Sequence, residues 1–166
     1  MRTTLGGAAD HDAPWIIVVG STMVDLISYV PRLPYAGETM WADGFALGFG
    51  GKGANQAVVS ALHGVRTSMV ACVGDDFFGR ETRANLQAHG VDVEFVHVVE
   101  GTTSGTATIF VEPSGQNRIA LGSGANSALD APDVQRAFEA FDAAHRAPPR
   151  LVVGQLETPQ GATASA

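Results

Sequence analysis

The segment best suited to chemistry is the glycine-rich run GFGGKGANQA, residues 48–57. Closely spaced glycines let backbone N–H groups approach a ligand, and the small and apolar residues that follow predict a helix over residues 53–63, whose N-terminus faces the same spot. Lys52 adds three donors and a positive charge, and Asn55 lies one turn into the helix. These groups suit sugar hydroxyls or a phosphate, unless the glycines only allow close packing of a helix on a sheet.

Two familiar nucleotide-binding loops fit this run poorly. Gly48, Gly50 and Gly53 have the Gly-x-Gly-x-x-Gly spacing of dinucleotide-binding folds. That fingerprint joins the first strand directly to the first helix, whereas roughly thirty residues intervene here. A P-loop has Ser or Thr after its lysine, and here Gly53 follows Lys52. The run is therefore not a Walker loop. A nicotinamide or flavin oxidoreductase stays an alternative, because the glycine spacing of its fingerprint is present.

The elements that must position this run alternate along the chain. Short apolar and β-branched runs predict buried strands at residues 15–19, 67–73 and 151–157, and a further strand at residues 26–30. Apolar spacing, capping residues and terminal glycines predict helices at residues 53–63, 77–89 and 132–145. Such alternation indicates an α/β fold with a mostly parallel sheet flanked by helices.

Two further regions complete the expected organisation. Apolar and polar side chains alternate in residues 91–99, 106–112 and 118–121, which predicts a small antiparallel β lid. A connection rich in glycine and aromatic residues is expected at residues 40–51. Residues 1–14 are small and polar and are expected to form a disordered tail.

The end of the chain also carries information. Only nine residues follow Glu157, too few for another crossover and strand, so the pattern favours a truncated α/β unit. The alternative is that residues 151–157 are simply the last strand.

Composition narrows the possible partners and location. The formal net charge is −7, which offers no electrostatic footprint for nucleic acid or an anionic membrane. No apolar run reaches the length of a membrane span, and the N-terminus has no signal-peptide pattern, so a cytoplasmic protein is expected. The five histidines lack metal-ligand spacing, so no metal site is expected, and Cys72 lies in a predicted buried strand as an inert apolar residue.

The glycine-rich run GFGGKGANQAV resembles the N-terminal signature of the ribokinase-like (PfkB-type) carbohydrate kinases, and its GGKGAN core is most similar to the ribokinase branch. Further blocks resemble that family in the same order over residues 15–160. They are VVGSTMVDLIS, PYAGET, ACVGDDFFG, GVDVEFV, TSGTATIFVEPSGQNRIALGSGAN and VVGQLETP. Residues 15–166 are therefore expected to form the N-terminal, sugar-binding part of such a kinase, including its β lid.

The resemblance implies a reaction and a sugar site. The reaction is ATP-dependent phosphorylation of the 5-hydroxyl of D-ribose, with Mg²⁺ on the phosphates and a monovalent cation, K⁺, as support. In the implied site two carboxylates accept from sugar hydroxyls, two glycines present backbone groups, and a lysine and an asparagine complete the cluster. These residues are Asp25, Gly50, Gly51, Lys52, Asn55 and Glu157. Met23 departs from the Asn of many bacterial members, so deoxyribose, a nucleoside or fructose stay possible substrates.

The catalytic segment of the family is absent from this sequence. Its Gly-Ala-Gly-Asp motif supplies the catalytic base and anion hole beside the ATP and cation sites, and residues 1–166 contain no such motif. We therefore expect no catalytic residue in this chain and no kinase turnover by it alone, because phosphoryl transfer depends on positioning and charge stabilisation. A noncatalytic sugar-binding remnant is the alternative. The exposed edge of the lid also implies a possible homodimer.

Overall fold

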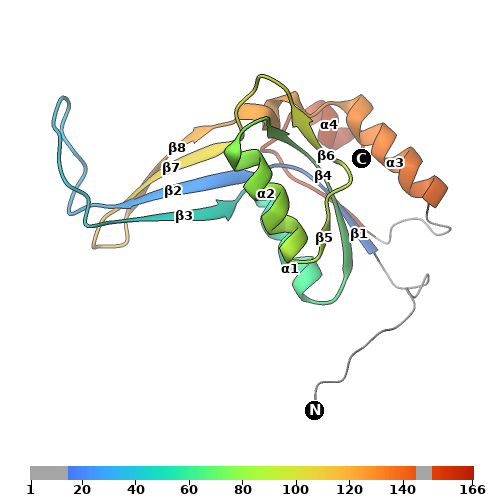
Figure 1. The fold of residues 1–166 in the computed structure, drawn as a ribbon, viewed down its shortest axis with the longest axis horizontal. Coiled ribbons are helices and arrows are strands. Elements are labelled where there is room, and N and C mark those ends of the chain that lie inside the picture. Colours follow the sequence, from blue (N-terminus) through green and yellow to red (C-terminus); the bar gives the residue numbers. More distant parts are fainter. Residues whose placement is uncertain (1–14, 145–150) are drawn as a thin grey trace, which may run out of the picture.

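The computed structural model describes residues 15–144 and 151–166 (Figure 1). A helix-covered parallel sheet forms the body, and a second, elongated sheet projects from it (Figure 1). The disordered tail expected at residues 1–14, together with His11 and His145, lies outside the described residues. Within the described ranges, no helix is both long enough and apolar enough to cross a membrane.

The body contains a five-stranded parallel sheet. β5, β4, β1 and β9 are neighbours in that order, and β6 also pairs with β4. The strands are β1 (Trp15–Val19), β4 (Arg66–Gly74), β5 (Val91–Asp92), β6 (Val96–Val99) and β9 (Leu151–Gly154). β1 and β4 are almost fully buried because both carry near-continuous apolar runs, as strands covered on both faces do.

Helices cover both faces of this sheet. They are α1 (Lys52–Leu62), α2 (Phe77–Ala88), α3 (Ala131–Ala144), α4 (Gln160–Ala164) and a 3₁₀ helix, η1 (Gly124–Ala128). Successive residues of β1 point to opposite faces. Ile17 and Val19 therefore join a core around Phe141 of α3, and Val18 joins a second core with Ala57 of α1. This arrangement confirms the α/β fold expected from the sequence.

A four-stranded sheet, called the lid below, extends from the body (Figure 1). Its strands, in spatial order, are β3 (Gly44–Gly50), β2 (Met23–Tyr29), β7 (Thr106–Val111) and β8 (Asn117–Gly122). β2 pairs with β7 in parallel, whereas the two outer pairs are antiparallel. The lid is therefore a mixed sheet and not the purely antiparallel one that the sequence suggested.

Two lid strands differ from the sequence prediction. β3 lies in the stretch that was expected only as a connection, because three glycines at positions 44, 48 and 50 dilute its apolar alternation. The strand expected at residues 26–30 begins earlier, at Met23, since Met23 and Val24 are both buried at the base of the lid.

Two other expectations were wrong within the parallel sheet. Residues 91–99 belong to the body and not to the lid, because the chain returns from α2 and pairs in parallel with β4 through two short strands. The last strand ends at Gly154 and not at Glu157, and it lies on the sheet edge, where Leu151 is 52% exposed. Its apolar sequence reflects partial packing on both faces, since Val152 contacts one core and Val153 the other.

Only three residues, 20–22, connect β1 of the body to β2 of the lid. Asp25 therefore lies at the base of the lid, beside the carboxyl ends of the parallel strands and the N-terminus of α1. In open α/β sheets, ligands bind in the crevice outside those carboxyl ends.

Candidate functional site

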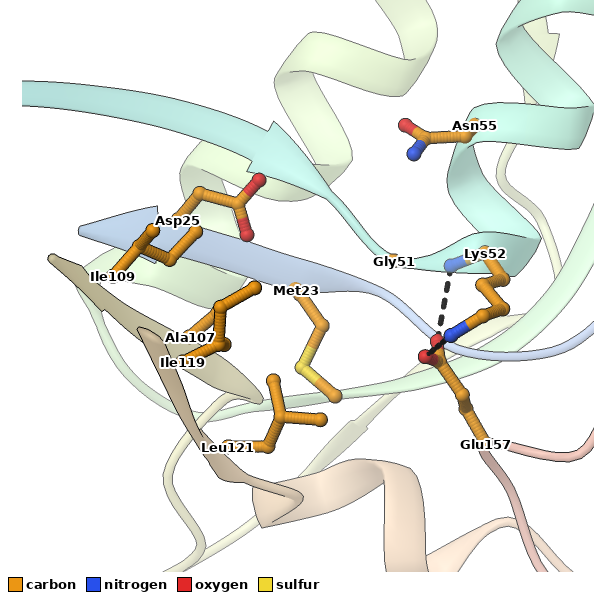
Figure 2. Close-up of a pocket in the computed structure, with 10 residues that line it drawn as sticks. All are labelled: Met23, Asp25, Gly51, Lys52, Asn55, Ala107, Ile109, Ile119, Leu121 and Glu157. Atoms are coloured by element: carbon orange, nitrogen blue, oxygen red, sulfur yellow. Dashed lines mark hydrogen bonds and ion pairs between the residues drawn. The ribbon is translucent and has the colours of Figure 1, made fainter. Parts of the chain in front are cut away.

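A cavity of about 390 Å³ opens at the base of the lid, between the N-terminus of α1 and the segment that follows β9 (Figure 2). Its lining residues are Met23, Asp25, Gly51, Lys52, Asn55, Ala107, Ile109, Ile119, Leu121 and Glu157. Five of the six residues implied for a sugar site are among them. The sixth, Gly50, is not in the lining and borders the Asp25 side chain instead.

Glu157 is held by groups from two other segments. Its Oε2 accepts a hydrogen bond from the Ser21 hydroxyl at 2.7 Å and from the backbone N–H of Lys52 at 3.1 Å, and its Oε1 pairs with the Lys52 ammonium group. Burial raises the pKa of the Glu157 carboxyl, but the hydrogen bonds and the charge of Lys52 outweigh this, so the net pKa is lowered. Glu157 is thus fixed in place as a carboxylate.

Asp25 faces the cavity from the opposite side (Figure 2). It comes from β2, and a Cβ atom on Gly50 would stand only 2.6 Å from its Oδ2, so the carboxylate needs a glycine on the neighbouring strand. Burial raises the pKa of Asp25, and the negative charge of Glu157 raises it further. Two carboxylates with opposite pKa shifts therefore face one cavity.

Close backbone contact fixes the start of α1. Gly51 has φ +91°, and a Cβ atom there would lie 2.8 Å from backbone atoms of residues 21–23. The N–H of Ala54 donates to the Ser21 carbonyl at 3.0 Å. The glycines of this run thus allow tight packing and also bring Lys52 and Asn55 to the cavity wall, so both interpretations of the run hold.

Apolar side chains form the opposite wall of the cavity (Figure 2). They come from the strands β2, β7 and β8 of the lid and are Met23, Ala107, Ile109, Ile119 and Leu121. Sequence reasoning did not identify this wall as part of a site. The alternation in residues 106–112 and 118–121 was the available signal, but its partner face became visible only with the lid assembled.

Ser21 is a second residue that sequence reasoning missed. It is fully buried directly after β1, its hydroxyl donates to Glu157, and the N–H of Gly53 approaches its Oγ at 3.5 Å. A serine that follows a buried strand looks like an ordinary turn residue in sequence, so only the contact across 136 residues of chain reveals its role.

The cysteine and two of the histidines considered in the sequence analysis lie outside the cavity lining. Cys72 is buried in β4, and burial, with smaller contributions from Asp133 and Asp130, raises the pKa of its thiol to about 12, which makes it a poor nucleophile. His63 and His89 each hydrogen-bond the carbonyl four residues earlier, at a helix end. In the part of the chain that the structure describes, no group of three or more His, Cys, Asp or Glu could hold a metal ion.

Known proteins resemble this chain in sequence and fold. Residues 14–159 match the model of the pfkB family of carbohydrate kinases. Mouse ribokinase is 38% identical over 157 residues, and Salmonella typhi deoxyribokinase is 43% identical over 142 residues. These matches cover 95% and 86% of this chain and 47% and 45% of the relatives.

Solved structures extend the likeness to the fold. Ribokinase of Arabidopsis thaliana, solved with ribose and ATP, superposes with a TM-score of 0.75 at 30% identity and covers 90% of this chain and 47% of its own. The chain thus spans about half the length of the relatives it matches. On this match of sequence and fold, the chain belongs to the pfkB family of carbohydrate kinases.

Proposed function

We propose that this protein provides the sugar-binding site of a kinase that transfers phosphate from ATP to the 5-hydroxyl of D-ribose. One observation carries the proposal: two carboxylates, Asp25 among the apolar side chains of the lid and Glu157 beside Lys52 and the N-terminus of α1, face one cavity from opposite sides. The relatives support it, since they include ribokinases from several organisms, among them the one solved with ribose and ATP.

The cavity chemistry suits a small polyol. Sugar hydroxyls would donate to the carboxylates of Asp25 and Glu157, while Lys52 and the amide of Asn55 would donate to sugar oxygens. The C–H surface of the ring would pack on the apolar wall of the lid. A mostly apolar cavity with a few fixed polar groups is the usual form of a small-molecule site. Gly50 would contribute indirectly, by leaving room for the Asp25 side chain.

ATP is the proposed phosphoryl donor, with Mg²⁺ bridging its phosphates and K⁺ supporting charge stabilisation, as the family resemblance implies. Among the described residues, no group of three or more His, Cys, Asp or Glu could hold a metal ion. What these residues would do is bind and orient the sugar. We propose that they do not turn it over by themselves, because the Gly-Ala-Gly-Asp motif, to which the family resemblance gives the base for the 5-hydroxyl, is not among residues 1–166.

Sugar binding to the purified chain tests the proposal. In isothermal titration calorimetry, D-ribose should bind, and Asp25→Ala should weaken that binding at least about tenfold, since hydrogen bonds to a charged acceptor are lost. Asp43→Ala is the matched control, because Asp43 is an exposed aspartate that does not line the cavity. Absence of ribose binding to the folded chain, or tight binding of a nicotinamide dinucleotide, would overturn the proposal.

Deoxyribose is a second candidate substrate, favoured by one observation. Met23 lines the cavity where an asparagine could have hydrogen-bonded a hydroxyl, and deoxyribokinases are among the relatives. A site without that donor loses less when the sugar lacks a hydroxyl. Competition between D-ribose and 2-deoxy-D-ribose distinguishes the two: tighter binding of the deoxy sugar to the wild-type chain, reversed in Met23→Asn, would assign deoxyribose.

We also propose that two copies pair through their lids, in the cytoplasm, with no nucleic acid or membrane partner. Large apolar residues are exposed on the face of the lid that points away from the cavity, among them Phe45 and Leu47. Pairing would cover this surface. Sedimentation velocity tests it: a dimer should form in the wild type and weaken in Phe45→Ser, and a monomer at all concentrations would contradict it.

A further inference from the structure

Gln155 fills a space that two glycines leave open. Its Nε2 lies 1.4 Å from where a Cβ atom on Gly20 would stand and 2.6 Å from where one on Gly53 would stand. No real Cβ atom tolerates such distances, so both positions need glycine while this amide is in place. Gln155 directly follows β9, whereas Gly20 directly follows β1 and Gly53 lies in the first turn of α1. One side chain therefore interlocks three elements.

Filling this space does not by itself require an amide. The Nε2 of Gln155 donates to the Val19 carbonyl at 3.3 Å, but its Oε1 is buried and has no hydrogen-bond partner among the described residues. An unpaired buried carbonyl oxygen is destabilising, and an apolar side chain of similar volume would fill the same space without it. A buried group of this kind points to a role besides packing.

The partners of Glu157 are the chain neighbours of the two glycines. Glu157 lies two residues beyond Gln155, and its Oε2 accepts from the Ser21 hydroxyl and the Lys52 N–H. Ser21 adjoins Gly20, and Lys52 adjoins Gly53. The amide of Gln155 thus lies on the same two segments that hold the Glu157 carboxylate.

We propose that Gln155 is a positioning residue of the sugar site. Its amide lies between Gly20 and Gly53 and donates to the Val19 carbonyl, which sets where the segment after β9 meets α1 and so keeps Glu157 in contact with Ser21 and Lys52. Gln155 is not in the lining of the cavity and acts only through Glu157. The link to sugar binding rests on the proposed function, whereas the interlock and its effect on Glu157 can be measured without any sugar.

A mutant cycle read by thermal denaturation tests the interlock. Gly20→Ala should lower Tm by roughly 3–10 °C while Gln155 is present, because the new methyl group overlaps the amide. In a Gln155→Ala background the same change should cost far less, since the three atoms nearest to that Cβ all belong to Gln155. Equal losses in both backgrounds would overturn the interlock.

Gly53→Ala is the matched control for this cycle. Its Cβ would also stand 2.8 Å from backbone atoms of Gly20 and Ser21, so removing the Gln155 side chain should not rescue it. A rescue of Gly20→Ala without a rescue of Gly53→Ala is the expected pattern.

Gln155→Met separates positioning from packing, because it keeps the volume and removes the amide. We expect this variant to fold, to bind D-ribose at least about tenfold more weakly, and to show a higher Glu157 pKa by carboxyl ¹³C NMR as the hydrogen bonds from Ser21 and Lys52 loosen. Asp25 and Lys52 are the charged groups that act on Glu157, so the titration is repeated with Asp25→Asn.

The outcomes distinguish this proposal from the proposed function. If Gln155→Met keeps the wild-type affinity for ribose and the wild-type pKa of Glu157, the positioning role is overturned, and Gln155 only fills space between the glycines. If the wild-type chain binds no D-ribose, the proposed function fails, and the Glu157 pKa still decides whether Gln155 positions that carboxylate. Should Gln155→Met not fold, the same pKa comparison is made with Gln155→Ala.

Discussion

The carboxylate of Glu157 lies on the N-terminus of α1, 105 residues away in sequence, where Oε2 accepts from the backbone N–H of Lys52 and Oε1 pairs with its ammonium group. A negative charge at this end of a helix is favourable, because the first N–H groups carry partial positive charge. The contact joins the segment that follows β9 to the glycine-rich run and so brings Glu157 and Lys52 together at the cavity.

Glu157→Gln should impair sugar binding far more than stability. The variant keeps the shape of the side chain but loses the charge that pairs with Lys52 and would accept from a sugar hydroxyl. We expect D-ribose affinity to fall about 10- to 100-fold, whereas stability should change by no more than about 1 kcal/mol, because the Lys52 side chain is 66% exposed and solvent screens the pair. Calorimetry and thermal denaturation measure the two effects, and Glu139→Gln, at an exposed position of α3, is the control.

Much of the fold could be predicted from the sequence because the relevant signals are local. The apolar run of β1 indicates a buried strand from its residues alone, and the glycine at position 64 marks the end of α1, where its φ is +80°. The glycine-rich run also predicted where Lys52 and Asn55 would face a ligand, and the structure brings both to the cavity.

The rest depended on contacts between distant segments. β3 has a weak alternation because of its glycines, and only its pairing with β2 makes it a strand. The apolar wall residues Ile109 and Ile119 read as ordinary lid positions until β7 and β8 are placed beside the cavity. Ser21 and Glu157 meet across 136 residues, a contact that no local pattern encodes.

Sugar affinity should fall as the solution is acidified, and Asp25 should be responsible. Burial and the charge of Glu157 raise the pKa of Asp25, whereas the pKa of Glu157 is lowered, so Asp25 takes up a proton first as pH falls. A protonated Asp25 accepts less well from a hydroxyl. The affinity midpoint should therefore lie above the ordinary aspartate pKa of 3.8. An affinity that stays constant until Glu157 titrates would contradict this order.

The raised pKa of Asp25 also predicts that Asp25→Asn stabilises the protein at neutral pH. Because the folded-state pKa of Asp25 is raised, its ionised form disfavours folding above that pKa, and the effect disappears when the group is protonated in acid. Asp25→Asn should thus have a higher Tm than the wild type at pH 7 while losing D-ribose binding. A lower Tm at pH 7 would show that the carboxylate is stabilising.

Asp76 should be a major source of stability at the base of the lid. Its carboxylate caps α2 through the N–H of Gly79 at 2.8 Å and accepts from the backbone and hydroxyl of Ser104 at 2.8 and 2.7 Å. Loss of a cap and of these charge-assisted bonds in Asp76→Ala should cost about 2–4 kcal/mol in urea unfolding. Asp75→Ala, an exposed neighbour, is the control and should be near neutral.

The stabilisation by Asp76 should decrease as the pH falls. Hydrogen bonds from Ser104 and Gly79, together with Arg80, outweigh the effect of burial and lower the pKa of Asp76. Its contribution is therefore present above the unfolded-state pKa and is lost as pH falls through the lower folded-state value. Wild type and Asp76→Ala should converge in stability in acid, and a constant difference between them would contradict this account.

Gly51→Ala should be among the most damaging single changes in the glycine-rich run. It forces a side chain onto a residue with φ +91° and places its Cβ 2.8 Å from three backbone atoms, so we expect a loss of at least about 3 kcal/mol. Gly64→Ala has a similar φ of +80° but open space around its Cβ, and should cost only about 1–2 kcal/mol. Equal losses would mean that the contact with residues 21–23 is not tight.

Methyl NMR during a D-ribose titration tests most directly whether the cavity at the base of the lid is a sugar site. With labelled Met and Ile methyl groups, the account predicts saturable shifts at Met23, Ile109 and Ile119, which line the cavity, and none at Met40, which does not. Asp25→Ala should abolish those shifts while the spectrum stays that of a folded protein. Shifts confined to other methyl groups, or no shifts at millimolar sugar, would contradict the assignment of this cavity as the sugar site.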